Sequence, residues 1–261
     1  MPVRAHGENV HVEHNGFVAI VTVDRPPYNH VTSTLLAYLA DAFEAIDEMH
    51  QIRATVLQTE GRSFCAGADL NREDDALGPI SGGISPLYGH AVRLFEVRKP
   101  IVAAIQGAAV GAGLGLALVA DFRVAAREAR FAANFVSLGI HPGFGLTYTL
   151  PRTIGQQSAN LLLLTGRRIK AQEAKALGLV DQLVPLVELR ANALSLAEEI
   201  AANAPLAVTA TRSTLRTGIA AAIGAQMVLE DAEQKRLRVT EDFAEGIRAV
   251  HERRSGDFRG R

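Results

Sequence analysis

Two segments rich in glycine and alanine could bring backbone amides up to a ligand. They are residues 63–69, which read SFCAGAD, and residues 107–118, which read GAAVGAGLGLAL. Small side chains at 66–68 and 111–113 let a ligand approach the main chain, where an exposed N–H is a fixed hydrogen-bond donor. Two such donors at one carbonyl oxygen would form an oxyanion hole, which stabilises an enolate or a tetrahedral adduct. Spacing alone does not bring the two segments together, so this chemistry depends on how the surrounding elements fold.

The composition is that of an ordinary globular protein. The chain has 261 residues, of which 48% are hydrophobic and 21% charged, and a formal net charge of −1. This charge predicts no nucleic-acid-binding surface. A single cysteine, Cys65, excludes an internal disulfide, and the 8 histidines lack the close pairing of a metal site, so we expect no metal. Residues 1–16 are polar and show no signal-peptide pattern, from which we expect a cytoplasmic protein.

The uncharged run at residues 101–120 has the length of a membrane span. It follows Arg98 and Lys99 and contains a pair of small residues at Gly107 and Gly111, as associating membrane helices do. Pro100 and four glycines interrupt the pattern, however, and no second span follows. We therefore expect a buried strand, a tight loop and a buried helix here, and no membrane partner.

Strands and helices alternate in the first half of the chain, and the last third is helical. Strands are expected at 17–23, 54–59, 101–105 and 122–126. A helix starting at 32–34 and running to about residue 50 has an apolar stripe, and another helix begins near Ala112. Successive amphipathic blocks follow at 161–164, 171–177, 187–203, 205–217, 220–239 and 241–253. The prediction is an α/β core over 1–200 with a helical extension over 201–261, whose apolar positions would serve core packing or a subunit interface.

Several motifs in register resemble the crotonase (enoyl-CoA hydratase/isomerase) superfamily over nearly the whole chain. In order, they read DRPPYN from Asp24, SFCAGADL from Ser63, KPIVAAIQGAAVGAGLGLALVADFRVAA from Lys99, LGIHPGFGLTYTLPRTIG from Leu138 and LTGRRIKAQEAKALGLVDQLVP from Leu164. The ending, EGIRAVHERRSGDFRGR, resembles the closing helix and tail of the family. This agreement in order and spacing is far more specific than one glycine-rich loop.

The resemblance implies a crotonase-like spiral of ββα units, with C-terminal helices that assemble a homotrimer or a dimer of trimers. It implies an acyl-CoA substrate, with coenzyme A as part of that substrate and no separate cofactor. The thioester carbonyl would lie between two backbone amides, which by position are those of Ala68 and Ala112. The family most often has glycine at the second position, but alanine still supplies an N–H.

The acid and base groups of the family's hydratases are missing at the matching positions. Their two glutamates correspond to Gly115 and Phe135, and an acidic residue of some other members corresponds to Gly143. If the alignment holds, the usual two-glutamate addition of water is unavailable. His141 lies beside the expected pocket wall and could transfer protons, or could instead be hydrogen-bonded in a rigid Pro-Gly turn. Loop carboxylates at 73–75 are a further candidate source of a proton.

Other residues resemble the family's substrate contacts. Arg25 and the backbone from Ala66 through Gly67 to Leu70 match adenine and pantetheine contacts, and Gly111 permits close approach. Phe135 suggests a dry, narrowed acyl pocket. The matching tail residue is Phe258, which would reach a coenzyme A site.

Several functions stay open at this point. A lyase or isomerase acting on an enoyl-CoA is favoured, and a hydrolase or C–C bond-cleaving enzyme using the same enolate stabilisation is the alternative. The third possible function is that of a non-catalytic acyl-CoA-binding protein. A dinucleotide enzyme is disfavoured, because the third glycine of a G-x-G-x-x-G motif would fall on Leu116 or Leu118.

Overall fold

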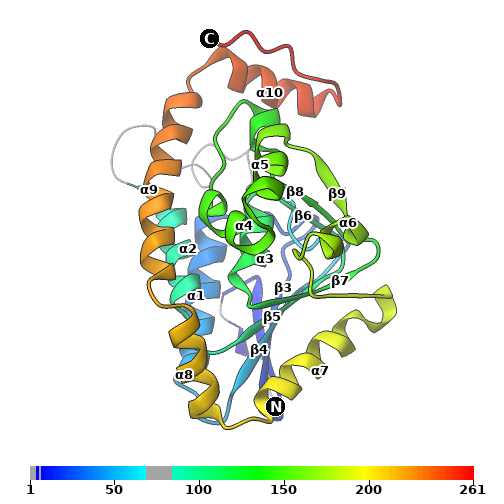
Figure 1. The fold of residues 1–261 in the computed structure, drawn as a ribbon, viewed down its shortest axis with the longest axis vertical. Helices are drawn as coiled ribbons and strands as arrows, with labels where there is room; N and C mark the ends of the chain where they lie inside the picture. Colours follow the sequence, from blue (N-terminus) through cyan, green and yellow to red (C-terminus); the bar gives the residue numbers. More distant parts are fainter. Residues whose placement is uncertain (1–3, 6, 69–83) are drawn as a thin grey trace.

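The computed structural model describes residues 4–5, 7–68 and 84–261, and these residues form two sheets surrounded by helices (Figure 1). The larger sheet has seven strands in the order β1-β2-β3-β4-β5-β7-β10, and the smaller has three in the order β6-β8-β9. The strands are β1 Arg4–Ala5, β2 Val10–Asn15, β3 Val18–Val23, β4 Ala54–Thr59, β5 Ile101–Ile105, β6 Ala108–Val110, β7 Phe122–Ala126, β8 Arg130–Ala132, β9 Arg168–Lys170 and β10 Gln182–Val184.

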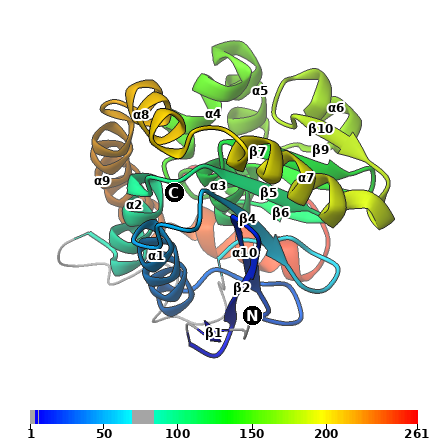
Figure 2. The same ribbon diagram turned by 90° about the horizontal axis from the view of Figure 1, so that it is seen from below.

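The centre of the large sheet is parallel and covered on both faces. Strands β3, β4, β5, β7 and β10 pair in parallel, and all five residues of β5 are buried. Val102 and Ala104 belong to an apolar cluster with helix α7 (Leu189–Ala201), whereas Ile101, Ala103 and Ile105 belong to the main core on the opposite face. Figure 2 shows α7 on one side of the sheet and helices α1 (Ser33–Asp47) and α2 (Pro86–Glu96) on the other. The alternation follows from the two-residue period of a strand.

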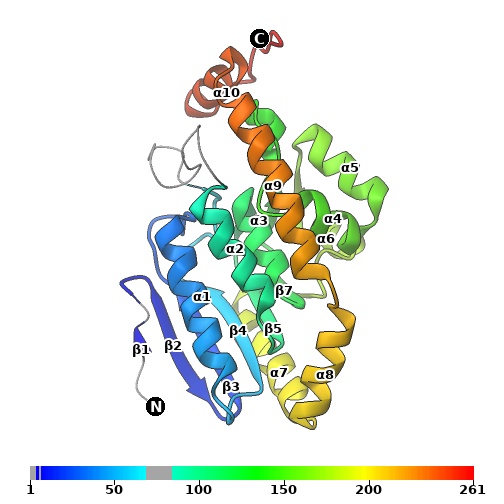
Figure 3. The same cartoon turned by 90° about the vertical axis from the view of Figure 1, so that its left-hand side faces the viewer.

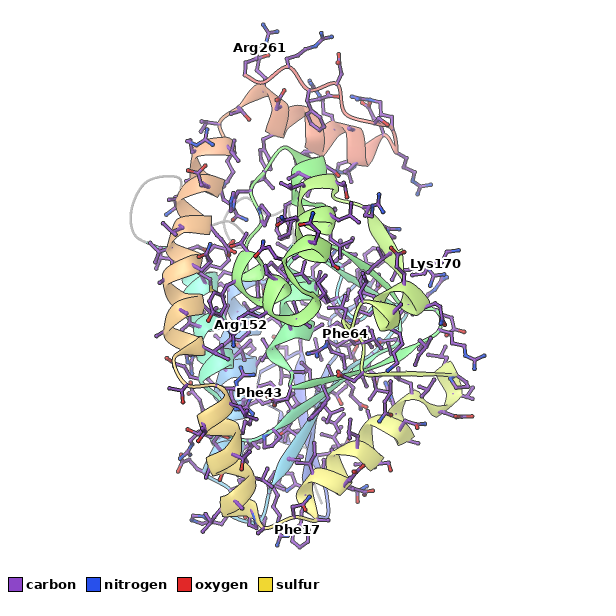
Figure 4. The ribbon with its side chains drawn as sticks, in the orientation of Figure 1. Phe17, Phe43, Phe64, Arg152, Lys170 and Arg261 are labelled. Carbon is purple, nitrogen blue, oxygen red and sulfur yellow. The ribbon has the colours of Figure 1, made fainter. Side chains whose placement is uncertain are left out.

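Helix α1 forms where its cap and apolar stripe predict it. The side chain of Thr32 accepts a hydrogen bond from the Leu35 amide at 3.1 Å, which caps the helix. The predicted stripe is buried: Leu35, Leu36, Leu39, Phe43 and Ile46. In Figure 4, Phe43 and Phe64 lie within the body of the molecule, whereas Lys170 and Arg261 lie at its periphery.

The apolar run at 101–120 folds as strand β5, strand β6 and helix α3 (Ala112–Val119), and all eight residues of α3 are buried. The expected loop contains the additional strand β6, which pairs with β8. Among the described helices, none is both long and apolar enough to cross a bilayer. The expectation of a buried strand and a buried helix is confirmed.

The second half of the chain is mostly helical. Its helices are α4 Leu146–Ile154, α5 Gln156–Thr165, α6 Ala171–Ala176, α7, α8 Pro205–Leu215, α9 Ile219–Leu237 and α10 Glu241–His251, with 3₁₀ helices η1 Asn134–Leu138 and η2 Leu186–Glu188. Figure 3 shows α9 running past α2 toward α10, and α9 packs on both α2 and α4. Helix α10 packs on η1. Helix α7 ends at Ala201, close to the predicted boundary at 200, and the division into two domains stays a prediction.

Candidate active site

The two glycine- and alanine-rich segments lie side by side. The Cys65 amide donates to the Ala108 carbonyl at 2.9 Å, and the Val110 amide donates to the Cys65 carbonyl at 3.0 Å. Gly67 follows with φ of +99°, and an added Cβ there would lie 3.0 Å from the Val110 carbonyl oxygen and 3.9 Å from the Ala112 nitrogen. The conformation and the lack of space both favour glycine at position 67.

A cavity of about 240 Å³ opens at this junction. One wall is main chain, from residues 66–68 and 110–112. The rest comes from three kinds of side chain: apolar Phe135, Leu138, Ile140, Ile247 and Val250, the amides of Asn134 and Gln234, and the imidazoles of His30 and His251. The α10 residues therefore help to enclose a cavity whose opposite wall is built by the first half of the chain.

Two backbone amides of this wall have no partner among the described residues. They belong to Ala68, which directly follows Gly67, and to Ala112, the first residue of α3. The first amides of a helix have no acceptor within the helix, and the helix dipole places positive potential there. Gly111 supplies the turn into α3 with φ of +55°. Two unpaired donors at one cavity can bind a carbonyl oxygen that gains negative charge.

The Phe144 ring fills the space beside Gly115, one of the positions at which the resemblance predicts a glutamate. Gly115 is buried in α3, and an added Cβ would lie 2.5 Å from the Phe144 ring. Phe144 is 1% exposed and adopts a positive φ of 62°, which is uncommon for an aromatic residue. The ring therefore occupies the space that a side chain at Gly115 would need.

The other two expected carboxylate positions are also without an acid. Phe135 lies on η1 and lines the cavity. Gly143 abuts a hydrogen-bonded pair, since an added Cβ would lie 2.1 Å from Tyr88 Oη and 2.6 Å from Gln234 Nε2. None of the three positions holds a group that can exchange a proton.

Gln234 links the cavity to its surroundings. Tyr88 Oη donates to Gln234 Oε1 at 2.7 Å, and Gln234 Nε2 donates to the His141 carbonyl at 2.8 Å. Burial raises the pKa of Tyr88, and the charge of Glu230 raises it further, so Tyr88 remains a neutral donor.

His141 lies next to the cavity rather than in its wall. Its Nδ1 is 2.7 Å from the Pro142 carbonyl, and of the described residues around this turn it is Ile140 that lines the cavity. Cys65 is fully buried, and burial raises the pKa of its thiol to about 12, as expected for a packed side chain.

The structure brings some of the predicted substrate contacts together and leaves others apart. Ala66, Gly67, Gly111 and Phe135 line the cavity. Arg25 and Phe258 are not among the residues that line it: Arg25 Nη1 donates to the His30 carbonyl at 3.2 Å, and Phe258 is 42% exposed on the C-terminal tail. Leu70 and the carboxylates at 73–75 are outside the described residues. The roles of all these residues stay predictions.

Sequence reasoning missed His30, Asn134, Gln234 and His251 as cavity residues. Gln234 and His251 belong to helices that begin more than a hundred residues after the glycine-rich segments, and no periodicity reports such contacts. His30 directly follows the DRPPYN motif, but its ring contacts the carbonyl of Gly67, which is 37 residues away. The one signal in the sequence was that the titratable side chain of His30 directly follows Asn29, the last residue of that motif.

The comparisons with known proteins identify the family. The model of the enoyl-CoA hydratase/isomerase family matches residues 13–261. The chain therefore belongs to this family. It is 37% identical to the 2,3-dehydroadipyl-CoA hydratase of Escherichia coli (strain K12), over 94% of this chain and 96% of that protein. It is 33% identical to the 1,2-epoxyphenylacetyl-CoA isomerase of the same strain, over 96% of this chain and 97% of that protein.

Solved structures confirm the predicted fold class. The crystal structure of an enoyl-CoA hydratase/isomerase from Pseudoalteromonas atlantica T6c superposes with a TM-score of 0.87 at 32% identity, over 97% of this chain and all of that one. The crystal structure of a carnitinyl-CoA hydratase from Mycobacterium avium superposes with a TM-score of 0.85 at 31% identity, over 97% of this chain and 99% of that one. The α/β fold is thus crotonase-like, with the helical C-terminal region in place.

Proposed function

We propose that this chain is an acyl-CoA lyase or isomerase in which the amides of Ala68 and Ala112 form an oxyanion hole. The observation that carries the proposal is a pair of amides on one cavity wall, neither of which donates to any residue in the described part of the chain. Both relatives are named as enzymes that act on a CoA compound, which supports an acyl-CoA thioester as the substrate class.

The proposed hole would act on the thioester carbonyl. Loss of a proton next to that carbonyl places negative charge on its oxygen, and two fixed N–H donors stabilise this charge without reorganising. One such donor contributes about 3 kcal/mol to transition-state stabilisation. The first turn of α3 adds its dipole at the same place. Pure binding of an acyl-CoA would gain little from this arrangement.

The absence of carboxylates at Gly115, Phe135 and Gly143 separates this chain from the two-glutamate hydratase mechanism. Proton transfer then needs another group. His141 is one predicted source, and its ring is held at the Pro142 carbonyl. Contacts of coenzyme A with Arg25, Leu70 and Phe258 are part of the same proposal.

A homotrimer or a dimer of trimers is also proposed. Apolar side chains are strongly exposed on α8 and α5, with Leu206 at 83%, Leu164 at 76% and Leu215 at 74%. Large apolar side chains exposed to this degree gain free energy when a second subunit covers them, and Leu206 and Leu215 both lie on α8. A cytoplasmic location and a role in fatty acid metabolism stay predictions.

Mass spectrometry of crotonyl-CoA and longer enoyl-CoAs in deuterated water tests the proposed function. We expect solvent deuterium in the acyl chain, or stoichiometric addition of water. Free coenzyme A with a carboxylic acid would instead indicate a hydrolase, and a shortened acyl group a C–C lyase. If the thioesters bind in the same samples but stay unchanged, the proposed catalytic function is contradicted, and an acyl-CoA-binding protein is indicated instead.

A further inference from the structure

The cavity contains titratable side chains despite the missing carboxylates. Within the described residues that line it, these are His30 and His251. His251 is the last residue of α10 and is exposed. His30 is half-buried, and its ring contacts the carbonyl of Gly67. The amide side chains of Asn134 and Gln234 cannot take up a proton near neutral pH.

The contact of His30 with Gly67 assigns its tautomer. His30 Nδ1 lies 3.2 Å from the Gly67 carbonyl oxygen, which also accepts the Val31 amide at 2.9 Å. A carbonyl oxygen only accepts, so the proton of the neutral ring belongs on Nδ1. The lone pair is then on Nε2, which makes no hydrogen bond to any residue of the described chain. A proton taken up at Nε2 gives an imidazolium that the same carbonyl stabilises.

The backbone around His30 is fixed from both sides. The side chain of Asn29 is buried and donates to the carbonyls of Glu60 at 2.7 Å and Ser63 at 2.9 Å. Arg25 Nη1 donates to the His30 carbonyl, and the Tyr28 ring meets the His30 ring edge-on with centroids 5.8 Å apart. Such support from neighbouring groups holds a reacting side chain in one geometry.

We propose that His30 is the proton-transfer residue of this pocket, a role that rests on the proposed oxyanion hole of Ala68 and Ala112. The Nε2 lone pair takes a proton from the carbon next to the thioester carbonyl. The C–H electron pair forms the enolate double bond, and the carbonyl π pair moves onto the oxygen, where the two amides bind it. The imidazolium then returns a proton to a carbon of the enolate or dienolate. No further reactant is consumed.

The test follows exchange of the α-protons of butyryl-CoA in deuterated water by mass spectrometry, with butyryl-CoA affinity measured by calorimetry. We expect His30→Gln to lose about 10²–10⁴-fold in exchange rate while it still binds butyryl-CoA, because general acid–base catalysis contributes that factor. His50→Gln is the matched control, because His50 is exposed after α1, and we expect it to exchange at the wild-type rate. Wild-type exchange in His30→Gln, or loss in His141→Gln alone, would overturn the role of His30.

The tautomer gives a second test that needs no variant. Proton–nitrogen correlation spectra of the ¹⁵N-labelled wild-type protein should show neutral His30 protonated on Nδ1, and an Nε2–H form would overturn the inference. Failure of the wild type to exchange any bound thioester contradicts the proposed function itself. Exchange by the wild type that survives in His30→Gln contradicts only the assignment to His30.

Discussion

At the scale of single residues, Phe144 occupies the space beside Gly115, the position at which the resemblance to the family predicts a glutamate. The Phe144 ring lies where a side chain at position 115 would go, with an added Cβ only 2.5 Å from the ring. Phe144 is itself buried, and the centroid of its ring lies 6.5 Å from the centroid of the Phe95 ring. The packing of the core around Phe144 therefore leaves no room for a larger side chain at position 115.

This packing predicts the effect of a single methyl group. We expect Gly115→Ala to lower the free energy of unfolding by about 1–3 kcal/mol, because the buried ring must shift to make room. The matched control is Gly89→Ala in α2, where an added Cβ meets nothing within 4 Å. Replacing glycine within a helix should raise stability there by about 0.5–1 kcal/mol. Urea denaturation of the two variants measures both values, and equal stability of the two would contradict the account.

The sequence predicted that the segments of Ala68 and Ala112 form part of one site, but it did not predict His30 in the cavity lining. Ala68 and Ala112 lie in segments whose small residues are visible in the sequence, and both segments meet as the resemblance implied. The contact of the His30 ring with Gly67 was not visible in the sequence, because only the fold brings these two residues together. A pair of residues so far apart leaves no local pattern.

At the scale of elements, the carboxylate of Glu230 joins α9 to the start of α4. It accepts hydrogen bonds from the amides of Gly145 at 2.7 Å and Thr147 at 3.0 Å, and from the Thr147 hydroxyl at 2.5 Å. These donors lower its pKa, but burial has the larger effect and raises it to about 7. Glu230 is 0% exposed, so the link is shielded from solvent.

The raised pKa of Glu230 makes stability depend on pH. Between the unfolded value near 4.5 and the folded value of about 7, the native state keeps a proton that the unfolded chain has lost. The free energy of unfolding should therefore fall as pH rises through this window, by about 1–3 kcal/mol, and level off above it.

Thermal melts across this pH range measure the effect. Glu230→Gln should remove the slope, whereas Glu128→Gln, at an exposed position, should keep it. A wild-type protein whose stability rises from pH 5 to pH 7 in the same melts would contradict the assignment.

Long elements with a strong period were predictable, and short ones were not. Helix α1 and strand β5 follow their apolar patterns. The C-terminal helices α8 and α10 fall within the predicted blocks, and α9 begins one residue before its block. Strands β6, β8 and β9 have three residues each and exist through pairing with one another, which no local propensity reports. Helix α2 has a proline in its first turn and a short apolar face, and it was not expected.

At the scale of the whole molecule, the C-terminal helices have two surfaces with different tasks. One surface closes the cavity through Ile247, Val250 and His251 of α10. The other leaves Leu206 and Leu215 of α8 exposed, next to Arg212, which pairs with Asp121 at 2.9 Å and anchors the helix on the core. Anchoring of this kind would hold the exposed side chains in place for a second subunit.

Sedimentation velocity tests the assembly. We expect the wild type to sediment as a trimer or a dimer of trimers, and the double variant Leu206→Glu/Leu215→Glu to sediment as a smaller species, because charges in an apolar interface are costly. A monomeric wild type would contradict the proposed assembly, and an unchanged species in the double variant would exclude α8 from the interface.

Ala112→Pro tests whether two amides donate to one substrate oxygen, as proposed for Ala68 and Ala112. Ala112 is the first residue of α3, where proline is tolerated, so the change removes one N–H and keeps the helix. Gln156→Pro is the matched control, since Gln156 also begins a helix after a glycine, far along the chain from the cavity segments. With butyryl-CoA in deuterated water, we predict that Ala112→Pro loses about 10²–10³-fold in α-proton exchange, while its melting temperature matches that of the control. Exchange at the wild-type rate by folded Ala112→Pro would contradict the oxyanion hole.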